Sequence, residues 1–326
     1  MMQIGLIGIG AGAAAALLFA SVTSGSLLAV VLFYLAPLPM MIAALGWSHW
    51  AALIGALAGA IALTAAFGSV FFFAFLAYAG LPAWWLGYLT MLARATPAGG
   101  NGGAPALEWY PPGRLVIWAA LLAAAAVMIG ILSFGGDGES FRAGLHNTLV
   151  ELLRAETGEP ANAPLAIPGV SNPQRLIDFL VRAVPLAAAV LATIVNLLNL
   201  WLAARIVNYS GRLARPWPRL SAMAFPRPLA AAFAVAVGLS FAGGIVGILA
   251  GVAAASLVIA FGALGFAVLH AVTRGMNARG FLLGGVYAAV LVFGWPVLAL
   301  ALLGLIETLA DLRARFGRAR TPPAPL

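Results

Sequence analysis

The chain has 326 residues, of which 63% are apolar and only 8% are charged, whereas about a quarter of the residues in an average soluble domain are charged. The mean hydropathy of +1.05 is spread over the whole length, and a soluble core of this size cannot bury so much apolar surface. Cysteine is absent, which excludes disulfides and thiolate metal sites. The composition therefore predicts an all-α fold, a polytopic bundle of transmembrane helices.

The formal net charge of +8 comes entirely from arginine, and it does not predict nucleic-acid binding. The arginines lie in short loops between apolar runs, where such residues mark membrane topology and contact lipid headgroups. The first apolar run, from Ile4 to Ala20, lacks a basic start and a cleavage site. We therefore expect it to be the first span and not a signal peptide.

A helix needs ~20 apolar residues to cross a hydrocarbon core of ~30 Å. Taken in chain order, the apolar runs predict about eight to ten spans within one transmembrane domain, residues 1–326. The candidate spans are residues 4–21, 26–46, 50–67, 69–92, 114–134, 183–205, 229–249, 251–272 and 281–306.

Two longer segments interrupt the spans. Residues 93–113 are rich in glycine and proline and are expected to form a loop. Residues 135–173 carry most of the acidic side chains, and within them residues 139–156 are expected to form an amphipathic helix on the membrane surface. The apolar face of that helix is expected to carry Phe141, Leu145, Leu149 and Leu152.

The charges in the loops indicate an orientation. The loop 205–227 holds five arginines, so the positive-inside rule places it in the cytoplasm and the acidic segment 135–173 outside. A count of nine spans then puts the C-terminus outside, although the basic terminal tail, residues 307–326, carries four arginines. Either one expected span is wrong or the tail violates the rule.

The first span contains G-x-G-x-x-A at Gly8, Gly10 and Ala13. A dinucleotide site would also need an acidic residue ~20 positions later and a βαβ unit, and the sequence has neither. Helix packing is the better interpretation, because small residues recur every four positions and share one face. This helix-interface set consists of Gly8, Gly12, Ala16 and Ala20. Packing within the chain is favoured over contact with another subunit.

The sixth span carries a stripe of polar or small residues at helical spacing: Asp178, Arg182, Pro185, Ala189, Thr193, Asn196, Asn199 and Ala203. Asp178 and Arg182 are expected to form an ion pair, since they are four residues apart.

The amides of Asn196 and Asn199 are unfavourable in hydrocarbon unless they face another helix or a wet cavity. Hydrogen bonding between helices and a ligand-facing wall both remain open. Broken helices often line cavities, and Pro37 and Pro39 interrupt the second span. The candidate ligand cavity is therefore bordered by Thr193, Asn196, Asn199, Pro37 and Pro39.

No catalytic constellation can be assembled. The three histidines, His49, His146 and His270, are scattered without metal-ligand spacing, and neither a nucleophile elbow nor a P-loop occurs. His270 is expected to anchor a span at headgroup level. We therefore predict no catalytic residue, no metal, no cofactor and no enzymatic activity.

Three segments carry a resemblance to a known family: FYLAPLPMMIAALGWSHWAALIGALAGA at 33–60, NLLNLWLAAR at 196–205 and LLGLIETLADLR at 302–313. They resemble the YybS-like family of bacterial polytopic membrane proteins, a domain of unknown function. That family is similar to the substrate-binding S components of energy-coupling-factor transporters. The resemblance implies the bacterial inner membrane as the location. It also implies that the helix-interface set on the first helix docks a coupling membrane subunit.

Two functions remain open at this point. The leading interpretation is the small-molecule-binding component of a transporter, with an unidentified ligand and with the lipid bilayer and a coupling subunit as partners. The alternative is a membrane scaffold or regulatory protein without a substrate of its own. A polar cavity that reaches into the membrane would favour the first.

Overall fold

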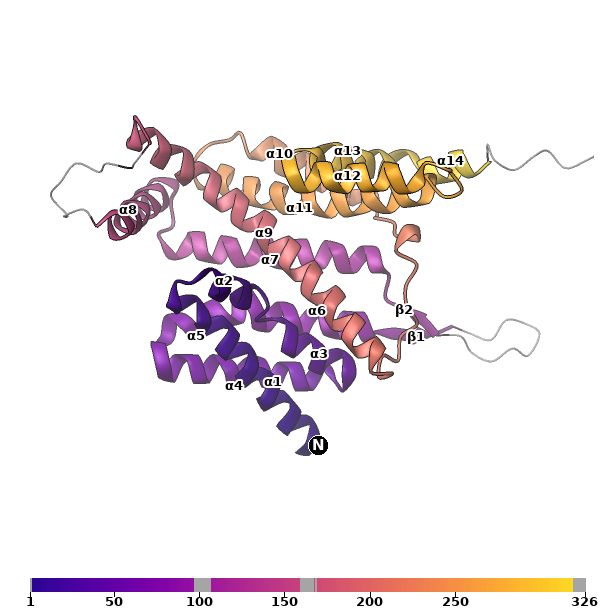
Figure 1. Ribbon diagram of the computed structural model, residues 1–326, viewed down its shortest axis with the longest axis horizontal. Coiled ribbons are helices and arrows are strands. Elements are labelled where there is room, and N and C mark those ends of the chain that lie inside the picture. The colour runs from indigo at the N-terminus through magenta and orange to yellow at the C-terminus, as the bar shows by residue number, and fades with distance from the viewer. Residues whose placement is uncertain (1, 97–106, 159–166, 168, 319–326) are drawn as a thin grey trace, which may run out of the picture.

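The computed structural model describes residues 2–96, 107–158, 167 and 169–318. Most of these residues are helical, which confirms the predicted all-α bundle (Figure 1). Seven helical segments are long and apolar enough to cross a membrane: Met2–Ser24, Leu27–Gly46, His49–Phe67, Ser69–Met91, Pro112–Ser133, Pro173–Tyr209 and Gly244–Val272. Three shorter apolar helices accompany them: Pro228–Leu239, Arg279–Phe293 and Pro296–Ala310.

The N-terminal half forms four of the long segments, and three of them are made of more than one helix. The elements are α1 (Met2–Ala20), a 3₁₀ turn (Ser21–Ser24), α2 (Leu27–Tyr34), α3 (Leu38–Gly46), α4 (His49–Phe67), α5 (Ser69–Phe75), a π-helical turn (Leu76–Gly80) and α6 (Leu81–Met91). Pro37 lies between α2 and α3 and lacks the N–H that would continue α2, whereas Pro39 lies in the first turn of α3, where a proline is tolerated. Gly68, with φ of 97°, lets the chain reverse between α4 and α5.

The segment between residues 93 and 113 is not only a loop. A two-stranded antiparallel ribbon joins β1 (Ala93–Ala95) to β2 (Leu107–Trp109), and Arg94 pairs with Glu108 across it at 2.7 Å. The centre of the expected loop, residues 97–106, lies outside the described residues.

The predicted surface helix is α8 (Gly138–Thr157), which follows α7 (Pro112–Ser133). Asp137 caps it by accepting hydrogen bonds from the amides of Glu139 and Ser140, and the Ser140 hydroxyl bond lowers the pKa of Asp137. Residues 159–166 and 168, which follow this helix, lie outside the described residues.

The buried face of α8 differs from the prediction at one position. Phe141 and Leu145 are buried and Leu149 is partly buried, as expected. Leu152, however, is 57% exposed, and Leu153 packs in its place. The spacing of four along the helix therefore continues through residue 153.

The C-terminal half corrects the predicted spans. The elements are α9 (Pro173–Tyr209), a 3₁₀ turn (Leu220–Ala222), α10 (Pro228–Leu239), α11 (Gly244–Val272), α12 (Arg279–Phe293), α13 (Pro296–Ala310) and α14 (Leu312–Arg318). The expected span 281–306 is wrong. Gly294 adopts φ of 71° and Pro296 begins a new helix, so the run folds into the antiparallel pair α12 and α13.

This correction resolves the topological conflict. We call the end of the bundle that carries loop 210–227, the β ribbon and α14 the arginine end, and the opposite end the α8 end (Figure 1). Because α12 and α13 run in opposite directions, α13 ends at the arginine end, where Arg313 contacts Ser221. Helix α13 continues through Ala310, beyond the expected start of the tail, and residues 319–326 lie outside the described residues.

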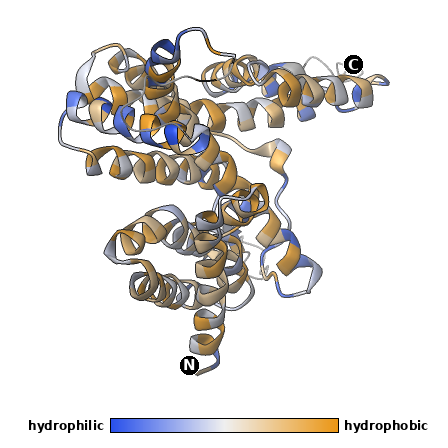
Figure 2. Ribbon diagram, turned by 60° about the vertical axis from the view of Figure 1, so that its left-hand side comes forward, coloured by the Kyte–Doolittle hydropathy of each residue, from blue (hydrophilic) through white to orange (hydrophobic). Residues whose placement is uncertain are grey.

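The helices form two groups that α7 and α9 connect (Figure 1). The first core gathers α1 to α6 with one side of α7 and α9, and the second gathers α7, α11 and α13. Hydrophobic residues cover most of the helices, and hydrophilic residues gather in α8 and in loops (Figure 2). Large apolar side chains such as Phe281 and Leu291 are 88% and 84% exposed. Such a surface belongs in lipid, so the chain is a multi-pass integral membrane protein.

Candidate functional site

The helix-interface set on α1 packs within the chain. Gly8, Gly12 and Ala16 are buried and Ala20 is partly buried. A Cβ atom added at Gly8 would lie 2.6 Å from the carbonyl oxygen of Ala51 on α4, and one at Gly12 would collide with the backbone of Gly55. On α4, Ala51, Gly55 and Gly59 repeat the same spacing of four, so two small faces meet. The face proposed to dock a coupling subunit is therefore already covered.

Thr193, Asn196 and Asn199 face the interior of the bundle, with exposures of 0%, 3% and 0%. The side chain of Thr193 donates to the carbonyl of Ala189 on its own helix, and Asn196 Nδ2 donates to the Ala119 carbonyl of α7 at 3.1 Å. These contacts are hydrogen bonds between and within packed helices.

Asn199 is joined to the break at Pro37. Proline has no N–H, and the amide of Leu38 donates to Leu35 instead, so the Tyr34 carbonyl has no helical donor. Asn199 Nδ2 supplies one at 2.8 Å. The structure thus brings Asn199 and the proline break together, but as a structural hydrogen bond.

None of the five candidate cavity residues lines either of two large cavities among the described residues. The first of these, the arginine-end cavity, has a volume of about 580 Å³ and lies between α7, α9, α11, α12 and loop 210–223. Its apolar walls include Leu115, Val116, Leu197, Leu200, Ala263 and Phe266. Trp201 of α9 and Tyr287 of α12 also line it and are 45% and 43% exposed, so the cavity opens between these helices.

Three arginines and one histidine line this cavity: Arg215, His270, Arg274 and Arg279. No aspartate or glutamate belongs to its described lining. An apolar interior with arginines at its rim is the chemistry that accepts an anionic group attached to an apolar chain.

Arg215 has a structural role. It is 5% exposed and donates to the carbonyl oxygens of Thr90 at 3.0 Å and Tyr110 at 2.8 Å. Thr90 lies in the last turn of α6, where carbonyls lack helical partners. Burial lowers the pKa of Arg215, but a guanidinium stays protonated. Arg215 therefore fixes loop 210–227 to the end of α6.

His270, Arg274 and Arg279 are the other basic side chains of the lining. Arg274 donates to the Ser221 hydroxyl at 2.9 Å, and His270 shares a hydrogen bond of 2.8 Å with the Tyr287 hydroxyl. The side chain of Arg279 makes no hydrogen bond or ion pair with any described residue. Of the four, Arg279 is thus the one best placed to receive an added anion. His270 does lie at the end of its span, as expected.

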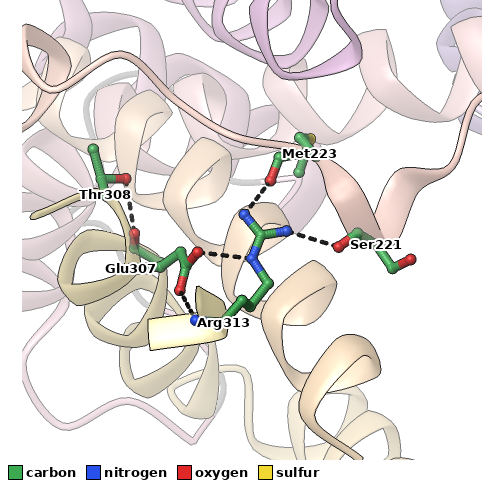
Figure 3. A network of polar contacts seen from close by, with 6 residues as sticks. Ser221, Met223, Glu307, Thr308 and Arg313 are labelled. Carbon is green, nitrogen blue, oxygen red and sulfur yellow. Dashed lines mark hydrogen bonds and ion pairs between the residues drawn. The ribbon is translucent and has the colours of Figure 1, made fainter. Parts of the chain in front are cut away.

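A second network at the arginine end holds the wall of this cavity in place (Figure 3). Arg313 forms an ion pair with Glu307 and donates to the carbonyls of Ser221 and Met223. Ser221 and Met223 themselves line the cavity. The C-terminal helices therefore determine where the loop that closes the cavity lies.

Four residues of this region were not predicted from the sequence as site residues: Arg215, Arg279, Glu307 and Arg313. Arg215 was identified only as part of an arginine-rich loop. One signal was available: Glu307 is a carboxylate inside an apolar run, and such a residue needs a partner. No protein-family model, curated protein or solved structure matches the chain.

Proposed function

We propose that this integral membrane protein binds an anionic amphiphile, a lipid-like molecule with an anionic headgroup, in the arginine-end cavity. The observation that carries the proposal is the combination in one cavity of apolar walls, cationic side chains at the opening and no described carboxylate. The headgroup would lie beside Arg279 and Arg274, and the chain along Phe266 and Leu197. The proposed role is binding and not catalysis.

The arginine end is proposed to face the cytoplasm of a bacterial inner membrane. Loop 210–227, the turn between α11 and α12, and α14 all bring arginines to this end, and the positive-inside rule places such an end in the cytoplasm. The ligand would then come from the cytoplasmic leaflet.

This proposal retains the small-molecule-binding interpretation but not a coupling subunit on α1. The small-residue face of α1 is covered by α4. The interior amides stabilise the bundle instead of contacting the ligand.

The test is lipid binding by the purified chain. Native mass spectrometry would compare phosphatidylglycerol with phosphatidylcholine of the same acyl chains. Arg279→Gln removes a cation that has no hydrogen bond to lose, so we expect phosphatidylglycerol affinity to fall about tenfold, the equivalent of about 1.4 kcal/mol. Arg315→Gln is the control, because Arg315 is exposed at the same end but does not line the cavity. Equal binding of the two lipids to the unmodified chain would contradict the proposal.

A further inference from the structure

A second cavity, the α8-end cavity, lies at the opposite end of the bundle. It has a volume of about 650 Å³ and lies between α8, α9, α11 and the turn from α12 to α13. Its apolar walls include Val181, Leu186, Val190, Ile248, Val258 and Leu298. Gly247 and Gly251 also line it from α11, and a Cβ at either position would lie only 3.2 Å from Ser240 or Leu186.

Two arginines line the α8-end cavity. Arg142 comes from α8 and Arg182 from α9, and both are exposed at its edge. The side chain of neither arginine makes a hydrogen bond or ion pair with a described residue. The expected pair between Asp178 and Arg182 does not form, and no carboxylate belongs to the described lining. The positive charge at this site is therefore uncompensated.

The start of α11 adds to this positive charge. Gly243 is its N-cap residue and supplies no side-chain hydrogen bond, so the first amides of a 29-residue helix lack a capping partner. Gly138, at the start of α8, packs on Gly244 so closely that a Cβ there would lie 2.8 Å from the Gly244 carbonyl carbon. This contact places Arg142, one turn further along α8, beside the start of α11.

We propose that the α8-end cavity is a second lipid site, which holds the phosphate headgroup and part of the chain of an anionic lipid from the leaflet at that end. The two guanidiniums and the α11 N-terminus complement a phosphate diester. The apolar walls complement an acyl chain, which a free phosphate lacks. A lipid is therefore a better match to the whole cavity than a soluble anion.

The spacing of the two cavities fits one site in each leaflet. Arg182 lines the α8-end cavity and Trp201 lines the arginine-end cavity. These positions on α9 are ~29 Å apart along the helix axis, close to the ~30 Å thickness of the hydrocarbon core.

One face of α9 between the two cavities is apolar. Leu186, Val190, Ile194, Leu197 and Trp201 follow one another at helical spacing, and Ile194 is 43% exposed. A charged headgroup would lose its hydration on this surface and find no partner. The two sites are thus filled separately, each from its own leaflet, and no headgroup passes between them.

Native mass spectrometry of the full chain in detergent, titrated with phosphatidylglycerol or phosphatidylcholine, tests the second site. The unmodified chain should bind two phosphatidylglycerol molecules in preference to phosphatidylcholine. Arg142→Gln combined with Arg182→Gln should weaken one of the two binding events at least tenfold. Arg175→Gln is the matched control, because Arg175 is exposed on the same helix but does not line the cavity. If the double variant kept both phosphatidylglycerol binding events unchanged, the proposal would be overturned.

Two further arms separate the alternatives. Displacement of the lipid by millimolar inorganic phosphate alone would show a soluble-anion site and overturn the lipid assignment. If the double variant loses one binding event while Arg279→Gln binds phosphatidylglycerol as the unmodified chain does, the result would support this site and reject the proposed function. The converse result would retain the proposed function and reject this site.

Vesicles containing the protein should exchange fluorescent phosphatidylglycerol between leaflets no faster than empty vesicles. Faster exchange would contradict the inference that each site is filled only from its own leaflet.

Discussion

Arg313 Nε lies 2.7 Å from Glu307 Oε1, in an ion pair that closes the turn between α13 and α14. Asp311 makes this turn possible, because it adopts a left-handed conformation with φ of 48° directly after α13. The Glu307 side chain is only 4% exposed, and the remaining guanidinium nitrogens reach two carbonyls of the loop before α10. One side chain therefore holds the C-terminal helices and the cavity loop together.

Arg313→Gln should destabilise the fold strongly, because it leaves the buried Glu307 carboxylate without its partner. Breaking such a pair typically costs about 3–5 kcal/mol, which the free energy of unfolding in mixed micelles would measure. Arg94→Gln is the matched control, since Arg94 and Glu108 form an ion pair whose side chains are 78% and 49% exposed. We expect its effect to stay below about 1 kcal/mol. Equal effects of the two substitutions would contradict the structural role of Arg313.

Gly12→Leu should unfold or severely destabilise the protein, by at least about 3 kcal/mol, because any side chain there collides with the backbone of Gly55. Gly10→Leu is the control on the same helix. A Cβ at Gly10 meets nothing within 4 Å, and its face is exposed. We expect Gly10→Leu to stay within about 1 kcal/mol of the unmodified chain. A stable, well-folded Gly12→Leu variant would mean that α1 does not pack on α4 as described.

Much of the fold could be predicted from sequence, because each crossing needs a long apolar run that composition reveals. The error at residues 281–306 arose because this apolar stretch has the total length of one span. Gly294 and Pro296 nevertheless end one helix and begin the next within it. Hydropathy alone cannot distinguish one long helix from two short antiparallel ones. The backbone of Gly294, with φ of 71°, reverses the chain and so makes two helices of this stretch.

The candidate site was predicted less well, and for a different reason. The interior position of Asn196 could be inferred, since lipid offers its amide no partner. Its partner is the carbonyl of Ala119, 77 positions away in the sequence. This partner could not be predicted, because it depends on how the helices pack. The arginine-end cavity likewise joins Leu115 to Arg279 through tertiary structure, so no local motif could reveal it.

Asn199→Ala should reduce stability by about 1–2 kcal/mol, because the Tyr34 carbonyl beside the proline break then loses its donor. Asn208→Ala is the control, since Asn208 is exposed near the end of the same helix. Thermal unfolding in detergent would measure both. Phosphatidylglycerol binding should be unchanged in Asn199→Ala, because Asn199 lines neither cavity. If Asn199→Ala instead lost lipid binding without any change in thermal stability, Asn199 would belong to the ligand site.

The orientation can be tested directly, because the chain contains no cysteine and each introduced thiol is the only one. Glu151→Cys places a thiol on α8, whereas Arg219→Cys and Arg315→Cys place one at the arginine end, and all three positions are exposed. A membrane-impermeant maleimide added to intact bacterial cells should label residue 151 and leave residues 219 and 315 unlabelled until the membrane is opened. The critical comparison is between 219 and 315, since the antiparallel pair α12 and α13 places both positions at the same end of the bundle. Labelling of residue 315 together with residue 151 would instead indicate a single span over 281–306. That topology would place Arg313 and Ser221 on opposite sides of the membrane, which is incompatible with the hydrogen bond between them.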